Sequence, residues 1–363
     1  MAINQELHSD LAVAPGEFLA EVLENRRMSQ ADLARRMGRP VQAINEIVKG
    51  EKAIMPETAI QLEQVLGVPA HIWTGLEAEF QLVRARLREE QQNSREVKLL
   101  EEIPYPQLVK LGVVQAVRGG MEQIRQLKSF FGVASLENLA QVNSFSSAFR
   151  VSRKKQASPY ALAAWLRCGE IQASGLATKP FARDGLKAEL TKIRRLTNEK
   201  PEAFAPALKQ TLADCGVALV ILPHLPKTYA HGATFWPSQD KAVIVMSIRG
   251  SWADIFWFSL FHELGHVLLH NSRMTFIEDE GEAVPETAKQ EEEADRFAAN
   301  VLIPNEKHTQ IASQRPASPE EIVAFARIAG IHPGIVVGRL QHDGLIPLAT
   351  PLNRLRVRLK WAG

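Results

Sequence analysis

The sequence predicts an α+β protein that is mostly helical, with an N-terminal helix-turn-helix bundle and a later domain whose small β-sheet packs on one buried helix. Three observations lead to this fold class. Apolar residues recur three and four apart through the first 80 residues, which is the period of helices. Three apolar runs between residues 217 and 248 have the length and composition of strands. A longer apolar run follows them and contains His262-Glu263-Leu264-Gly265-His266.

Length and composition limit the kind of protein this can be. With 363 residues, two or three domains are expected, and we place them at 1–80, 81–150 (a helical connector) and 151–363. An apolar content of 45% and a charged content of 23% are typical of a soluble globular chain, and a net charge of +2 is too small to indicate a partner. The two cysteines lack paired spacing, which favours a cytoplasmic location. The longest apolar run is too short and too polar to span a bilayer, so no membrane partner is expected.

The first 80 residues contain the signals of four short helices. Ser29 can cap the second of them, and Gly38-Arg39-Pro40 can form a three-residue turn before the third. Two crossed helices joined by such a turn form the helix-turn-helix arrangement, whose second helix enters the DNA major groove. The predicted helices are Glu17–Asn25, Gln30–Met37, Val41–Val48 and Thr58–Leu66.

Charge within this region supports a DNA partner. All seven basic residues of the first 80 lie between residues 26 and 52, where only three acidic residues occur. Gln42 and Asn45 lie on the exposed side of the third helix, where their amides can read adenine edges. Arg39, Lys49 and Lys52 are better placed for phosphates. One such unit contacts a half-site, so a homodimer on an operator is expected; the alternative is a helical protein-interaction module with a solvated basic face.

The His-Glu segment predicts a metal site. Residues four apart share a helix face, so His262 and His266 can reach one ion, and neutral imidazole suits Zn²⁺. Glu263 can then lie beside the water of such a site. We expect this helix to begin at Ser251, with Asp254 as a capping-box partner, and to be buried because it is apolar nearly all round. The alternative is a core helix whose histidines bond to backbone.

A second helix, which Pro304 ends, can supply the third ligand. Glu291 and Asp295 are four apart and share a face, so one carboxylate can bind the metal while the other accepts the free N–H of a ligand histidine. Glu291 is the first choice for the ligand and Glu292 the second. Further along, basic and apolar residues alternate from Arg354 to Trp361, which predicts an edge strand with one basic face.

The acidic pattern after His-Glu-x-x-His resembles the gluzincin metallopeptidases, which have a zincin-like fold. The similarity to the ImmA/IrrE family of zinc metallopeptidases is more specific and covers roughly residues 150–345. It implies Zn²⁺ held by His262, His266 and Glu291, with Glu263 as general base, and regulatory proteolysis of a DNA-binding repressor. It also implies that an edge strand pairs with substrate, for which we name Gly232–Trp236. The matching motifs are His262-Glu263-Leu264-Gly265-His266, Leu268-Leu269-His270, Glu291-x-x-Ala294-Asp295-x-Phe297-Ala298-Ala299 and Leu302-Ile303-Pro304.

The segment from Pro15 to Trp73 resembles XRE/Cro-type helix-turn-helix proteins, especially HigA-like antitoxins. Together the two resemblances imply a DNA-binding transcriptional regulator with a zinc-dependent endopeptidase domain. The alternative is an antitoxin-like repressor whose metal domain senses or docks a partner, such as a HigB-like toxin, without cleaving it. A third hypothesis is autoproteolysis within 81–150.

Overall fold

The computed structural model describes residues 13–151, 157–270, 275–279, 288–314 and 318–361. The chain divides into two compact units, Met1–Val97 and Lys98–Gly363. The expected domain border at residues 80 and 81 falls inside one continuous helix of the first unit, and the expected connector is shared between the two units.

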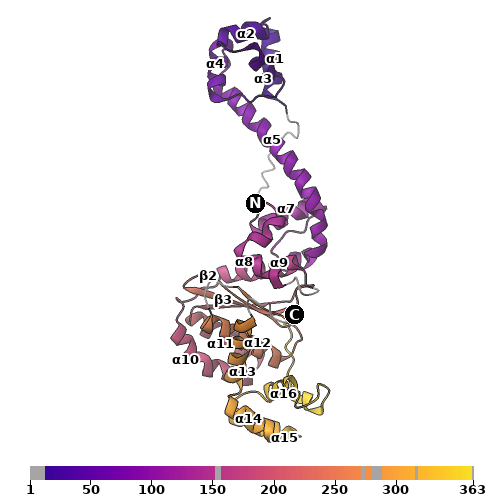
Figure 1. Cartoon of the computed structure of the whole chain (residues 1–363), viewed down its shortest axis with the longest axis vertical. Coiled ribbons are helices and arrows are strands. Elements are labelled where there is room, and N and C mark those ends of the chain that lie inside the picture. Colours follow the sequence, from indigo (N-terminus) through magenta and orange to yellow (C-terminus); the bar gives the residue numbers. More distant parts are fainter. Residues whose placement is uncertain (1–12, 152–156, 271–274, 280–287, 315–317, 362–363) are drawn as a thin grey trace. The chain divides into compact units, whose positions relative to one another are not determined.

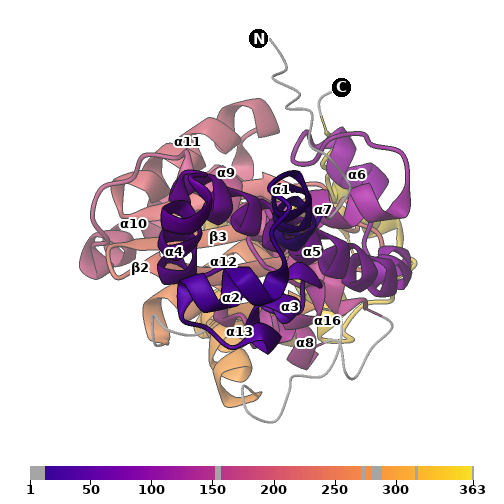
Figure 2. The ribbon, with the colours of Figure 1, turned by 90° about the horizontal axis from the view of Figure 1, so that it is seen from above.

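The first unit is a helical bundle with its own core. Figures 1 and 2 show its short helices gathered around one another. Ser29 caps α2, because its hydroxyl accepts a hydrogen bond from the Asp32 amide at 3.1 Å. Leu19, Leu33, Ile44 and Leu62 are fully buried, one from each of the four short helices. The elements are α1 (Pro15–Asn25), α2 (Gln30–Met37), α3 (Val41–Val48), α4 (Pro56–Leu66) and α5 (Ala70–Glu96).

The predicted helix-turn-helix is present in this unit. Helices α2 and α3 begin and end at the predicted residues, and Gly38 ends α2 in the left-handed conformation. Buried Leu33 and Ile44 lie at the contact of the two helices, as their spacing predicts. One face of α3 therefore stays exposed beside the turn.

The second unit surrounds a four-stranded mixed sheet with helices (Figure 1). Helices lie on both sides of it, and the strands at 217–222 and 241–247 are buried along nearly their whole length. The helices are α6 (Tyr105–Lys110), α7 (Gly120–Phe131), α8 (Asn143–Val151), α9 (Pro159–Ser174), α10 (Arg183–Arg195), α11 (Pro201–Asp214), α12 (Ala253–Leu269), α13 (Ala288–Leu302), α14 (Asn305–Gln314), α15 (Pro319–Ala329) and α16 (Pro333–His342), with short 3₁₀ segments at 97–102, 136–141, 196–198 and 351–355.

The sheet runs β1-β3-β2-β4, with β1 parallel to β3 and the other pairs antiparallel. Three strands match the predicted runs, and the fourth was not predicted. The strand β2 lies between β3 and β4, with Thr234 paired to Ile244 on one side and to Phe276 on the other. Gly232–Trp236 is therefore not an edge, and that expectation is wrong. The strands are β1 (Val217–Leu222), β2 (Ala230–Ser238), β3 (Lys241–Ser247) and β4 (Phe276–Asp279).

The two faces of the sheet contact different helices. Figure 1 shows α9 on one side and α11 and α12 on the other. On the α9 side, Gly169 lies so close to Val245 that a Cβ there would come within 2.4 Å of its methyl group. On the other side, Leu219 and Ile244 belong to the main core together with Phe261 and Leu264 of α12. The helix that carries the His-Glu segment is thus fixed against the sheet by its own apolar residues.

Two local predictions about the second unit are wrong. The helix α12 begins at Ala253 with Trp252 as its N-cap, and Ser251 has a positive φ of 60° and does not cap it. Asp254 instead forms an ion pair with Arg356 at 2.7 Å, which supplies the charged partner that a buried carboxylate needs. The segment after Arg354 forms no strand, and its pairing is limited to one bridge between Trp252 and Arg358.

Among the described residues, no single helix has the length and apolar character needed to cross a membrane. The bent pair Pro319–Ala329 and Pro333–His342 meets that test by length and composition alone.

Candidate metal centre

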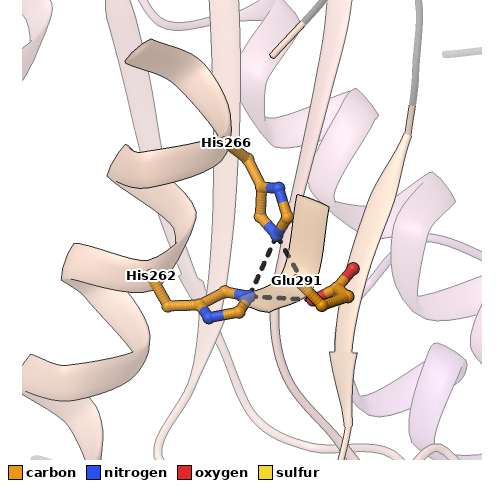
Figure 3. Close-up of side chains that lie close together, drawn as sticks. All are labelled: His262, His266 and Glu291. Atoms are coloured by element: carbon orange, nitrogen blue, oxygen red, sulfur yellow. Dashed lines mark hydrogen bonds and ion pairs between the residues drawn. The ribbon is translucent and has the colours of Figure 1, made fainter. Parts of the chain in front are cut away.

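The helix α12 presents His262, Glu263 and His266 inside the protein. All three side chains are buried, on a helix whose remaining residues are nearly all apolar. Buried polar groups of this kind are costly unless hydrogen bonds or a metal satisfy them. Figure 3 shows the two imidazoles on one face of the helix, turned toward Glu291.

Three ligand atoms converge at this point. Nε2 of His262 lies 2.9 Å from Nε2 of His266 and 3.1 Å from Oε2 of Glu291, and His266 Nε2 lies 3.4 Å from the same oxygen. Tetrahedral zinc with bonds of about 2.0–2.1 Å holds its ligand atoms about 3.3 Å apart. The observed triangle is close to that size, so this donor set fits a single zinc ion.

Asp295 determines which nitrogen of His262 faces the triangle. Its Oδ1 lies 2.8 Å from Nδ1 of His262. A carboxylate accepts, so Nδ1 carries the hydrogen and Nε2 presents its lone pair to the other two ligand atoms. Such a contact also fixes the direction of the ring.

His270 determines which nitrogen of His266 faces the triangle. This contact was not predicted from the sequence. His266 Nδ1 lies 2.9 Å from His270 Nδ1, and His270 Nε2 lies 3.1 Å from Oε2 of Glu293. Glu293 can only accept, so the hydrogens lie on His270 Nε2 and on His266 Nδ1. His266 Nε2 is then left as the lone-pair donor. The four-residue step from His266 to His270 was the available signal in the sequence.

Two residues of strand β2 fix the position of the Glu263 side chain. The Thr234 hydroxyl donates to its Oε2 at 2.5 Å. Gly232 lies two residues earlier in β2, and a Cβ there would come within 2.6 Å of Oε1 of Glu263 and 2.8 Å of its Cγ. Only glycine leaves room for this carboxylate. Neither residue could be assigned from the sequence, because the contact joins segments 29 residues apart.

The charges of the centre follow from burial and from these contacts. Burial lowers the pKa of His266 to about 4, which keeps its imidazole neutral at physiological pH. For Glu291, burial acts to raise the pKa, but the close approach of the His262 and His266 rings outweighs it and lowers the pKa to about 2. Two neutral imidazoles and one carboxylate are the protonation states that bind a divalent cation.

Glu292, the second choice for the third ligand, faces away from the centre. Its side chain is 72% exposed and forms an ion pair with Arg296 at 2.7 Å. Successive helix residues are about 100° apart, so the two neighbours cannot both face α12. The structure places Glu291 in the centre.

The residues predicted to contact DNA lie around α3 and the turn before it. Gln42, Lys49 and Lys52 are exposed, whereas Asn45 and Arg39 are half-buried. The Gln42 amide donates to Glu46 at 3.0 Å, and Arg39 donates through Nε to Gln61 at 2.6 Å. Reading of a base by Gln42 therefore requires that it exchange Glu46 for the base edge.

Comparison with protein families assigns the two regions separately. Residues 218–336 match the IrrE N-terminal-like domain family, and residues 19–73 match a helix-turn-helix family. A comparison with curated proteins finds no match.

Solved structures similar to this chain include two small proteins. One is a putative antidote protein of a plasmid maintenance system from Nostoc punctiforme, 26% identical over 23% of this chain and 91% of its own, with a TM-score of 0.22. Another is an addiction module antidote protein of a HigA family from Coxiella burnetii, 27% identical over 23% of this chain and 94% of its own, with a TM-score of 0.22. From the family matches, this chain joins an XRE-type helix-turn-helix domain at residues 19–73 to an ImmA/IrrE-type, metallopeptidase-like domain at residues 218–336.

Proposed function

We propose that this protein is a DNA-binding regulator whose second unit is a zinc-dependent endopeptidase. The observation that carries the proposal is the convergence of His262, His266 and Glu291 beside the buried carboxylate of Glu263. The helix-turn-helix match supports the DNA-binding part, and the IrrE-like match supports the peptidase part.

In this proposal His262, His266 and Glu291 hold Zn²⁺, with Asp295, His270 and Glu293 orienting the two imidazoles. Zinc bound by such a set supplies Lewis-acid polarisation of the scissile carbonyl and makes water more acidic.

Glu263 carries the proton transfers. Its carboxylate accepts a proton from the attacking water, whose oxygen bonds to the carbonyl carbon. The same proton passes to the amide nitrogen as the C–N bond breaks, so the products are an amine and a carboxylic acid, which then releases the second proton of the water to solvent. The Thr234 hydroxyl keeps the Glu263 carboxylate in one orientation during both transfers.

The substrate and partners are also part of the proposal. The ImmA/IrrE resemblance supports a DNA-binding repressor as the protein substrate. The helix-turn-helix supports an operator as the DNA partner and a homodimer as the bound form, because one unit covers only a half-site. Gln42 and Asn45 would read bases there, while Arg39, Lys49 and Lys52 would contact phosphates. Two buried free cysteines are compatible with a cytoplasmic location.

Metal analysis and one substitution test this function. The purified full chain should contain about one zinc per chain, and Glu263→Gln should retain it. A repressor substrate should be cut by the wild type and not in the presence of chelator, and Glu263→Gln should slow cleavage about 10²- to 10⁴-fold. Cleavage by Glu263→Gln at the wild-type rate would exclude the mechanism.

The same assay distinguishes the proposed peptidase from a docking module that does not cleave its partner. That alternative predicts a stable stoichiometric complex with a repressor or toxin. No fragments should form, with or without chelator. A mass measurement of aged protein tests the third hypothesis, because autoproteolysis within 81–150 would release a fragment that contains the helix-turn-helix.

A further inference from the structure

The second unit contains an apolar cavity of about 470 Å³ next to the candidate metal centre. Three helices and the start of β2 form its walls. Half of the twelve lining residues have aliphatic or phenyl side chains: Ile255 and Phe258 from α12, Ala299, Leu302 and Ile303 at the end of α13, and Ile335 from α16. Cavities that accept organic groups have this size and lining.

Two residues of the cavity wall connect it to the segments around the proposed general base. Ser259 lines it and precedes His262 and Glu263 by three and four residues, so it lies on their face of α12. His231 also lines it and is the neighbour of Gly232, which contacts Glu263. A peptide whose scissile bond lies at Glu263 would therefore have a side chain within reach of the cavity.

Asp254 is the one carboxylate among the described residues of the cavity wall, and it is already paired with a cation. Asp254 accepts from Nε of Arg356 at 3.0 Å and from Nη2 at 2.7 Å, so both of its oxygens are occupied. Both side chains are nearly buried, at 7% and 10% exposure. A cationic side chain entering the cavity would have to displace this bidentate pair, which is costly.

The other charged lining residues are likewise paired. Arg339 donates to Asp343 at 2.8 Å, and His342 lies 3.2 Å from the same carboxylate. His308 approaches Asp343 as well, at 2.7 Å. Among the described lining residues, the cavity thus offers apolar contact and no unpaired carboxylate for a basic group.

We propose that this cavity is the subsite that selects the substrate, and that it takes a large uncharged apolar side chain next to the scissile bond. The inference rests on the proposed peptidase function and adds the class of residue recognised. Apolar surface that enters such a cavity leaves water, so each added carbon should strengthen binding.

Binding of paired inhibitors tests the inference without a known substrate. The zinc-loaded full chain is titrated calorimetrically with dipeptide hydroxamates that differ in one side chain only: methyl, isobutyl or aminobutyl. The isobutyl compound should bind at least about tenfold more tightly than the methyl compound, because three buried carbons separate them. It should also bind more tightly than the aminobutyl compound, which would bury a charge.

Filling the cavity should remove that preference. Ala299→Leu places three extra carbons in the space, so the ratio of isobutyl to methyl affinity should fall to about one. Ala207→Leu is the matched control, because Ala207 is exposed on α11 and its substitution should leave the ratio unchanged. Ala299→Val adds less volume and serves if Ala299→Leu does not fold by circular dichroism; it should lower the ratio in the same direction.

The outcomes separate this inference from the function on which it rests. Equal affinity for the methyl and isobutyl compounds in a zinc-loaded wild type would overturn the subsite and leave the metal centre intact. Tighter binding of the aminobutyl compound would overturn the apolar assignment. Failure to retain zinc and to bind any hydroxamate would overturn the proposed peptidase and the subsite with it.

Discussion

The Thr234 hydroxyl lies 2.5 Å from Oε2 of Glu263, and both residues are fully buried between the sheet and α12. The hydrogen bond joins the internal strand β2 to the helix that carries both histidines. Its geometry gives the carboxylate one orientation, which a proton acceptor requires because misplacement of a reacting group slows catalysis.

Loss of this hydroxyl should slow turnover without loss of zinc. Thr234→Val preserves the volume and removes the donor, so kcat should fall about tenfold or more while KM stays unchanged, since a hydrogen bond to a charged group contributes about 1.5–3 kcal/mol. Thr234→Ser should restore most of the rate. Cleavage kinetics and metal content together test this prediction. A fall in zinc content equal to the fall in rate would show a structural role instead.

His270 should matter for zinc affinity although it does not belong to the triangle. His270→Ala removes the acceptor for Nδ1 of His266, and the loss of such an outer contact weakens metal binding about 10- to 100-fold. Competition with a chromophoric chelator measures the affinity. His224→Ala is the control, because His224 is exposed in the loop before β2. Unchanged zinc affinity in His270→Ala would contradict the assigned tautomers.

Arg356 should stabilise the second unit more strongly at neutral than at acidic pH. Burial raises the pKa of Asp254, and its hydrogen bonds with Arg356 oppose that rise. A carboxyl with a raised folded-state pKa stabilises the fold fully below its unfolded pKa, and this stabilisation is lost as pH rises through the folded pKa. Arg356→Met removes these hydrogen bonds, so the folded-state pKa of Asp254 should rise further. The loss of unfolding free energy in this variant should therefore increase from pH 4 to pH 7, toward about 3–5 kcal/mol.

Urea unfolding at both pH values measures that cost, and the chain offers a matched control. Arg356 and Arg358 both lie 4.2 Å from the ring centre of Trp252, but Asp254 pairs with Arg356 alone in the described part of the chain. Arg358→Met should therefore show a small cost that does not depend on pH. A double change of Asp254→Asn and Arg356→Met should also lose the pH dependence. An equal deficit for Arg356→Met at pH 4 and pH 7 would exclude this explanation.

On DNA, Lys49 should act through phosphate rather than through bases. Lys49→Ala should lower affinity by a similar factor on every duplex tested, and the slope of log K against log salt should fall in magnitude by about 0.9. Fluorescence anisotropy at several salt concentrations measures both quantities. Lys187→Ala, at an exposed position of the second unit, should leave them unchanged. An unaltered slope for Lys49→Ala would place Lys49 outside the DNA contact.

Local sequence patterns predicted many of the helices and strands and part of the candidate metal centre. The helix-turn-helix helices and three strands follow from apolar periodicity, because those residues are buried within their own unit. The strand β4 was missed because Phe276–Asp279 has only four residues, too few to show a clear alternation of apolar and polar positions. The N-terminus of α12 was wrongly placed because Asp254 pairs with a residue 102 positions away, and local capping rules contain no such partner.

By itself the sequence determined that His262 and His266 share one helix face, because a spacing of four residues fixes this wherever the helix packs. Only the tertiary structure decided which acid joins them. Ala294 packs against Gly265, and buried Ala298 lies on the same face of α13, so the rotation of that helix turns Glu291 inward and leaves Glu292 in solvent. The contacts of Glu263 with Thr234, of His270 with Glu293 and of Asp254 with Arg356 likewise depend on packing between distant segments, which no local pattern encodes.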